Sequence, residues 1–121
     1  MHHSVKTTDF QMTPEVSEYL SAKLVSLEKY ISKDDESVKC EVEIGRTTEH
    51  HQSGPIFRVE INVSIGKKLL RAEATEESIN AAIDSAKDEM VKRLRRHKGR
   101  QFALLRKGGE KIKNFLRFGR R

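Results

Sequence analysis

The densest group of chemically active side chains in this sequence is the stretch VKRLRRHKGR at residues 91–100, where six of ten residues are Lys or Arg. Cationic side chains at this density attract polyanions, and each phosphate that they neutralise releases condensed counterions. The C-terminus of a helix needs only one or two cations to complement its dipole. We therefore expect this stretch to bind a polyanion, with a merely solvated helix end as the alternative.

Charge is distributed unevenly along the chain. The chain has 24 Lys and Arg and 18 Asp and Glu. Residues 1–90 contain 11 of the basic and 17 of the acidic residues, a net charge of −6, whereas residues 91–121 contain 13 basic residues and one acidic residue, a net charge of +12. A positive field of this strength favours nucleic acid over a small acidic substrate. The length of 121 residues indicates one domain with its own core, and we predict a domain at 1–100 followed by a basic, Phe-containing tail at 101–121.

The other reactive side chains do not form a catalytic or metal-binding motif. Histidines are adjacent at 2–3 and at 50–51, but no Cys or carboxylate spacing completes a tetrahedral metal site. The sequence contains no phosphate-binding glycine loop and no nucleophile elbow. Cys40, the single cysteine, alternates with apolar residues as a buried core residue does. We expect no enzyme activity, no metal and no cofactor, and the lack of an apolar span or signal segment predicts a cytosolic protein.

The elements that must position the basic stretch follow from the apolar periodicity. A short strand is expected at about residues 3–8, and a helix begins at residues 13–15, where Thr13 caps it and Pro14 takes its first position. Apolar residues at steps of three and four give this helix one buried stripe. The stripe comprises Val16, Leu20, Leu24, Leu27 and Ile31.

Strict alternation predicts strands over 38–45, 56–66 and 69–75, which form an antiparallel meander with a tight turn at residues 66–68. One face of the sheet is polar, and the helices must cover the other. We interpret the acids on the polar face as members of cross-strand charge pairs and not as an active site. The outward residues are Lys39, Glu41 and Glu43 on one strand and Arg58, Glu60 and Asn62 on the next.

A second helix is expected to begin after a cap at Thr75, to bury a stripe from Ile79 to Leu94 and to end at Gly99. In the tail, a hinge at Gly108-Gly109 precedes a short helix with Ile112, Phe115 and Leu116 on one face. The predicted fold class is α+β, in the order β-α-β-β-β-α, with two helices packed on one face of a four-stranded sheet. This order resembles the double-stranded-RNA-binding architecture, which recognises nucleic acid by shape and backbone contacts.

Two segments carry a resemblance to a known family. They are FQMTPEVSEYLSAKLVSLEKY (10–30), with its TP start and its KL and LEKY motifs, and LLRAEATEESINAAIDSAKDEMVKRLRRHKGR (69–100), with its AID core and basic KRLRRHKG ending. In these features, over about residues 1–100, the sequence resembles the ribosome hibernation promoting factor family, which includes ribosome-associated inhibitor A (protein Y).

The resemblance implies a non-enzymatic stress-response factor that inhibits translation in idle ribosomes. Such a factor lodges in the channel for messenger and tRNA on the small ribosomal subunit of the 70S ribosome, where basic side chains on both helices bind phosphates of 16S rRNA. Arg93 also lies close to the apolar stripe, so its stem could run along the edge of the core. The positions in this sequence that match the RNA-binding residues are Lys23, Lys29, Lys87, Lys92, Arg93, Arg95, Arg96, Lys98 and Arg100.

Two other functions stay open on the sequence alone: a general double-stranded-RNA-binding or RNA-chaperone module, and a peripheral membrane or assembly protein that uses its tail. The tail at 101–121 matches neither the acidic end of protein Y nor the linker and dimerisation domain of the long factors. It could anchor on rRNA or a ribosomal protein, remain disordered, or lie at a membrane surface. We expect no membrane partner, and a separate ribosome-dimerising partner protein stays open.

Overall fold

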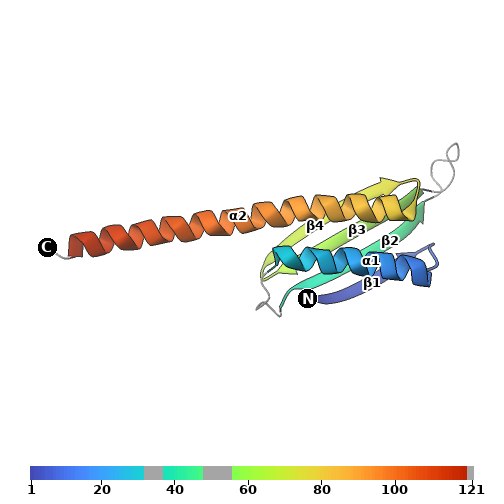
Figure 1. Ribbon diagram of the computed structural model, residues 1–121, viewed down its shortest axis with the longest axis horizontal. Helices are drawn as coiled ribbons and strands as arrows, with labels where there is room; N and C mark the ends of the chain where they lie inside the picture. The colour runs from blue at the N-terminus through green and yellow to red at the C-terminus, as the bar shows by residue number, and fades with distance from the viewer. Residues whose placement is uncertain (32–36, 48–55, 120–121) are drawn as a thin grey trace.

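Two helices lie side by side on one face of a four-stranded sheet (Figure 1). The computed structural model describes residues 1–31, 37–47 and 56–119, and within these ranges the side chains up to Lys107 except those of Phe102 and Leu105. The order β-α-β-β-β-α confirms the predicted α+β fold. The strands are β1 (His2–Thr8), β2 (Lys39–Thr47), β3 (Ile56–Ile65) and β4 (Lys68–Glu76), and the helices are α1 (Pro14–Leu27), the short 3-10 helix η1 (Glu28–Tyr30) and α2 (Ile79–Gly119).

The strands follow one another across the sheet in the order β1-β2-β3-β4. β1 is parallel to β2, because α1 and η1 return the chain along the sheet after β1 and before β2. β2, β3 and β4 form the predicted antiparallel meander. The turn between β3 and β4 places Gly66 at φ 59°, a left-handed conformation that glycine adopts without the clash of a Cβ atom. This short turn fixes the register of β4, and with it the position of α2.

The core lies between the sheet and the helices, where the two apolar periodicities meet. Period two on the strands and steps of three and four on the helices bring the predicted stripes together. Cys40 is fully buried, as predicted, and burial raises the pKa of its thiol to about 11. The buried residues include Leu20, Leu24 and Leu27 of α1, Ala82, Ile83, Ala86, Met90 and Leu94 of α2, and Val42, Ile44, Val59, Ile61 and Val63 of the central strands.

The open face of the sheet carries charge pairs, as predicted, but their partners differ from the expectation. Glu60 is 3.3 Å from Arg71 on β4 and 2.9 Å from Arg58 on its own strand, and Arg58 also bonds Glu73 of β4 at 2.7 Å. The register sets Glu43 of β2 directly opposite Glu60, another acid. The cross-strand pairs that include Glu60 and Arg58 therefore join β3 to β4, because that junction offers opposite charges.

The predicted start of the second helix is wrong. β4 continues through Thr75 to Glu76, and α2 begins at Ile79. Ser78 caps the helix: its Oγ accepts a hydrogen bond from the amide of Ala81 at 3.1 Å, and its carbonyl accepts one from Ala82 at 3.0 Å. These bonds satisfy amide groups of the first turn that have no partner within the helix.

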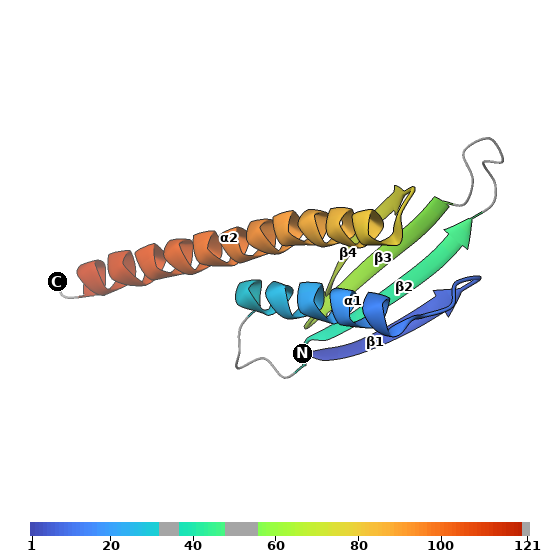
Figure 2. The same ribbon diagram turned by 45° about the vertical axis from the view of Figure 1, so that its right-hand side comes forward.

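The predicted end of this helix is also wrong, because α2 continues for 41 residues through Gly99 and through residues 108–109 to Gly119. Gly99 does not adopt a positive φ, and a Cβ built there would meet nothing within 4 Å. Residues 100–107 contain no proline, and most of them are strong helix formers, so a single glycine does not end the helix. As Figures 1 and 2 show, α2 therefore extends well beyond the end of the sheet as one uninterrupted helix.

Candidate RNA-binding surface

The charged side chains between α1 and the first turns of α2 are bound to one another. Asp84 accepts a hydrogen bond of 2.6 Å from the hydroxyl of Tyr19, and it lies 3.2 Å from Nζ of Lys23, which also sits 5.1 Å from the centre of the Tyr19 ring. The hydrogen bond from Tyr19, followed by that from Lys23, lowers the pKa of Asp84, and the contact with Asp84 raises the pKa of Lys23. Lys23, one of the predicted RNA-binding residues, thus connects the two helices.

Two further predicted residues have acidic neighbours on α2. Lys87 lies 3.7 Å from Asp88, and the side chain of Lys87 is only 23% exposed. Arg93 lies 3.5 Å from Glu89, one turn earlier, with its side chain 44% exposed. Their positive charge is partly compensated within the protein, which reduces the attraction that each exerts on an external phosphate.

Beyond Met90 the situation changes, because the sequence contains no Asp or Glu between residues 91 and 109. Arg95 packs over the ring of Tyr30, 5.4 Å from its centre, and donates a 3.4 Å hydrogen bond to the Tyr30 hydroxyl. This contact brings η1, with its exposed Lys29, next to α2. The remaining predicted residues are exposed and form no ion pair with any described residue: Lys92, Arg96, Lys98 and Arg100.

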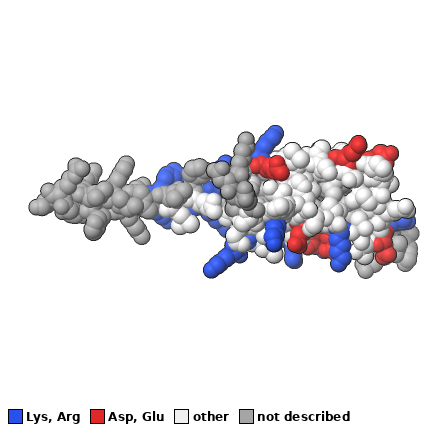
Figure 3. Space-filling model, turned by 90° about the horizontal axis from the view of Figure 1, so that it is seen from below, with Lys and Arg blue, Asp and Glu red and all other residues white. Residues whose placement is uncertain are grey.

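The surface reflects this division of charge. In Figure 3 the acidic side chains lie mainly over the part of the body remote from the α2 extension, and basic side chains predominate where α2 leaves the body. The structure thus brings six of the nine predicted residues to one region: Lys29, Lys92, Arg95, Arg96, Lys98 and Arg100, with Arg93 at its edge. We call this region the basic end of α2. It contains the unpaired positive charge that a polyanion would encounter first.

A groove lies beside this region, between the start of β4 and α2, and the sequence did not reveal it. Its volume is about 180 Å³. β4 contributes Lys68, which the sequence places next to a turn and far from the basic stretch. The pairing of Lys68 with Ile65 and the packing of β4 against α2 bring it there, and neither contact can be read from local sequence. The groove is lined by Lys68, Leu69, Leu70, Arg93, Arg96, His97 and Arg100.

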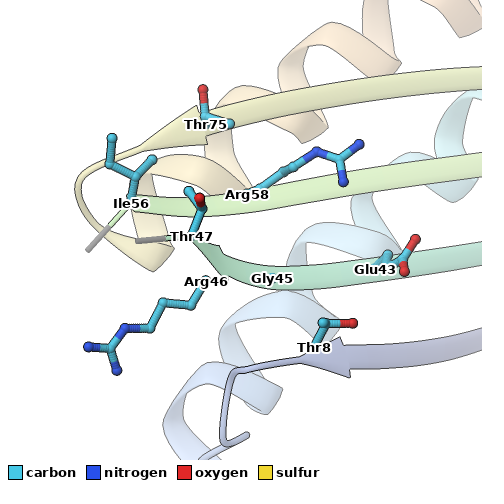
Figure 4. A pocket seen from close by; sticks show the side chains of 8 residues that line it. All are labelled: Thr8, Glu43, Gly45, Arg46, Thr47, Ile56, Arg58 and Thr75. Atoms are coloured by element: carbon cyan, nitrogen blue, oxygen red, sulfur yellow. The ribbon is translucent and has the colours of Figure 1, made fainter. Parts of the chain in front are cut away.

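A larger hollow of about 460 Å³ lies at the far end of the sheet, around Gly45 (Figure 4). Its polar groups do not converge on a ligand. Arg58 is held by Glu60 and Glu73, and the side chain of Arg46 points away from that of Arg58. Glu43 adds a negative charge to the lining. We therefore assign the candidate site to the basic end of α2.

Within the described ranges, no group of three or more His, Cys, Asp or Glu is arranged to hold a metal ion. His50 and His51, the adjacent pair considered from the sequence, lie outside the described residues. No helix in the part of the chain that the structure covers has the length and apolar character that crossing a bilayer requires.

Comparison with known proteins adds a family to this description. The family model described as sigma 54 modulation protein / S30EA ribosomal protein matches residues 4–101. The chain is 24% identical over 98 residues to a protein of Bacillus subtilis named ribosome hibernation promotion factor, a match that covers 81% of this chain and 49% of that protein. The chain therefore spans about half the length of this curated relative.

Solved structures show the same fold. The N-terminal domain of Protein Y from Thermus thermophilus superposes with a TM-score of 0.66 at 24% identity, covering 80% of this chain and 99% of that one. A ribosomal subunit interface protein from Coxiella burnetii gives a TM-score of 0.66 at 15% identity, with coverages of 82% and 99%. The relationship predicted from the motifs is confirmed: the chain belongs to the sigma 54 modulation protein / S30EA ribosomal protein family.

Proposed function

We propose that this chain binds the small ribosomal subunit, occupies the channel for messenger and tRNA by contacting phosphates of 16S rRNA, and thereby blocks translation in idle ribosomes. The observation that carries the proposal is the set of exposed cations without ion pairs at the basic end of α2. The names of two similar proteins, a hibernation promotion factor and a ribosomal subunit interface protein, support the ribosome as the partner.

The geometry suits binding to RNA phosphates. Arginine and lysine side chains on the exposed sides of one rigid helix present fixed positive charge, which RNA backbone binds through charge-assisted hydrogen bonds. Folded RNA is recognised largely by shape and by such backbone contacts. Because each contact releases counterions, affinity should fall steeply with salt.

The structure also changes which predicted residues we propose as RNA contacts. Lys92, Arg95, Arg96, Lys98 and Arg100 are the principal ones, with Lys29 beside them on η1. Arg93 lies at the edge of this group, and we propose a weaker RNA contact for it because Glu89 offsets part of its charge. We assign Lys23 and Lys87 mainly to contacts within the protein, since each already has an acidic neighbour.

The test is co-sedimentation of the full chain with purified small subunits and 70S ribosomes in the presence of excess duplex RNA. The test variant carries Arg95→Glu, Arg96→Glu and Lys98→Glu. A matched control carries Lys6→Glu, Lys39→Glu and Arg46→Glu, which produces the same change of charge at exposed positions on β1 and β2, two strands that do not contact α2. A translation assay with messenger and tRNA as competitors then tests occupancy of the channel.

We expect the control to bind as the unmodified chain does and the α2 variant to bind more than about a hundredfold more weakly, with a log-log salt slope lower by about 2 to 3. Equal loss in both triple variants would show that net charge alone decides binding. Complete displacement by free duplex RNA would instead identify a general RNA-binding module.

A further inference from the structure

The groove between β4 and α2 has the composition of a small anion site. Arg93, Arg96, His97 and Arg100 stand at i, i+3, i+4 and i+7, so they share one face of the helix. Lys68 contributes the opposite wall from the first residue of β4. No carboxylate lines the groove.

His97 supplies a second, independent observation. Its Nε2 atom is buried and has no hydrogen-bond partner, and no other side-chain nitrogen or oxygen in the described part of the chain is in this condition. Leaving a buried polar atom without a partner is unfavourable, so in folded proteins such an atom is usually bonded to a protein group, a water, an ion or a ligand. His97 is one of the residues that line the groove, so a group seated there would lie beside its imidazole.

The surrounding charges decide which partner is favoured. Lys68, Arg96 and Arg100 form no ion pair with any described residue, and Arg93 shares its charge with Glu89. Leu69 and Leu70 add apolar wall, which strengthens electrostatic interactions by lowering the local dielectric constant. Several cations around a small hollow match a group with several acceptor oxygens and a negative charge, which is the chemistry of a phosphate.

We propose that this groove seats a single phosphate of the RNA backbone and that His97 donates a hydrogen bond to it in the protonated form, so that RNA binding takes up a proton. The inference deepens the proposed function and rests on it for the identity of the RNA.

The physical reason lies in the neighbours of His97. The charged groups that line the groove with it are Lys68 from β4 and three arginines from α2, all of them cations. A seated phosphate reverses the sign of the local field and favours the imidazolium. Since histidine ordinarily changes its charge between about pH 5 and pH 8, the coupling falls in a physiological range.

The experiment measures the dissociation constant for small subunits, and separately for a short RNA duplex, at about pH 6 and about pH 8. The variants are His97→Gln, which keeps a polar side chain but does not titrate, and Lys68→Gln. Their matched controls are His2→Gln, at an exposed position on β1 at the far edge of the sheet from β4, and Lys67→Gln, next to Lys68 but outside the groove. Thermal unfolding confirms that each variant is folded.

We expect the unmodified chain and His2→Gln to bind about three- to tenfold more tightly at the lower pH, because binding takes up part of a proton over this range. His97→Gln should lose this pH dependence, and Lys68→Gln should weaken binding more than Lys67→Gln does. An unchanged pH dependence in His97→Gln overturns the proton uptake, and equal effects of the two lysine variants overturn the groove. If His97-dependent binding occurs with the duplex but not with small subunits, the groove stands and the proposed function fails.

Discussion

The two parts of α2, before and after Met90, carry charge in different ways. In the first part, Asp84, Asp88 and Glu89 lie within ion-pair distance of Lys23, Lys87 and Arg93. In the second part, the exposed cations other than Arg93 form no ion pair with any described residue, and the sequence contains no acid between residues 91 and 109. The comparison teaches that the number of lysines and arginines does not define a binding surface. What matters is whether their charge is already compensated within the protein.

The largest expected effect concerns packing in the first part. Ile83 is fully buried between α2 and the sheet, whereas the side chain of Leu104, on the extension, is exposed. Ile83→Ala should lower the free energy of unfolding by about 2–5 kcal/mol, because it removes buried apolar surface and leaves a cavity. Leu104→Ala should change it by less than about 0.5 kcal/mol. Urea denaturation followed by circular dichroism measures both, and equal losses would contradict the division of the helix.

The next effect concerns single charges. Arg96→Gln should weaken binding to small subunits by about threefold to tenfold and lower the log-log salt slope by about one unit. The reason is that it removes one phosphate contact made by an arginine with no ion-pair partner among the described residues. Lys87→Gln should leave the slope nearly unchanged, because Lys87 is largely covered and lies beside Asp88. Dissociation constants at several salt concentrations provide the slopes. A larger change for Lys87→Gln than for Arg96→Gln would reverse the comparison.

The smallest effect sharpens the role of Asp84. Its pKa is lowered, mainly by the hydrogen bond from Tyr19, so its ionised form stabilises the fold above the ordinary aspartate pKa of about 3.9. This contribution is lost as the pH falls through the lower folded-state value. Asp84→Asn should cost about 1 kcal/mol or less near neutral pH, and it should flatten the loss of stability below about pH 4.

Asp88→Asn is the matched control for this measurement, because the Asp88 side chain is 70% exposed and lies 3.7 Å from its nearest cation. Denaturant midpoints between about pH 7 and about pH 3 distinguish the two variants. If both variants flatten the acid slope equally, the contact of Asp84 with Tyr19 and Lys23 has no special role in joining the helices.

The spacing of apolar residues predicted the fold, because each strand repeats a period of two and each helix repeats steps of three and four over several turns. Helix ends were less predictable, since local signals competed. Thr75 and Ser78 are both good caps, and only the start of the apolar stripe at Ile79 favours Ser78. Glycine is a common residue at helix ends, but the residues that follow Gly99 are mostly helix formers, so the helix continues through it.

The candidate site was predictable as a basic stretch but not as a set of free charges. Lys23 and Asp84 are 61 residues apart in the sequence, and only the packing of α1 against α2 brings them together. The same holds for Lys68, which reaches the groove through the register of β4. Contacts between distant elements decide which charges remain available, and a single sequence does not contain them.

The continuity of α2 also has a mechanical consequence. A helix of 41 residues is about 60 Å long, and its first turns are embedded in the core while its last turns lie beyond the sheet. Because its backbone is helical throughout, the far end has a defined direction relative to the core. A partner that holds the far end therefore sets the orientation of the whole sheet, and a force applied there is transmitted directly to the core.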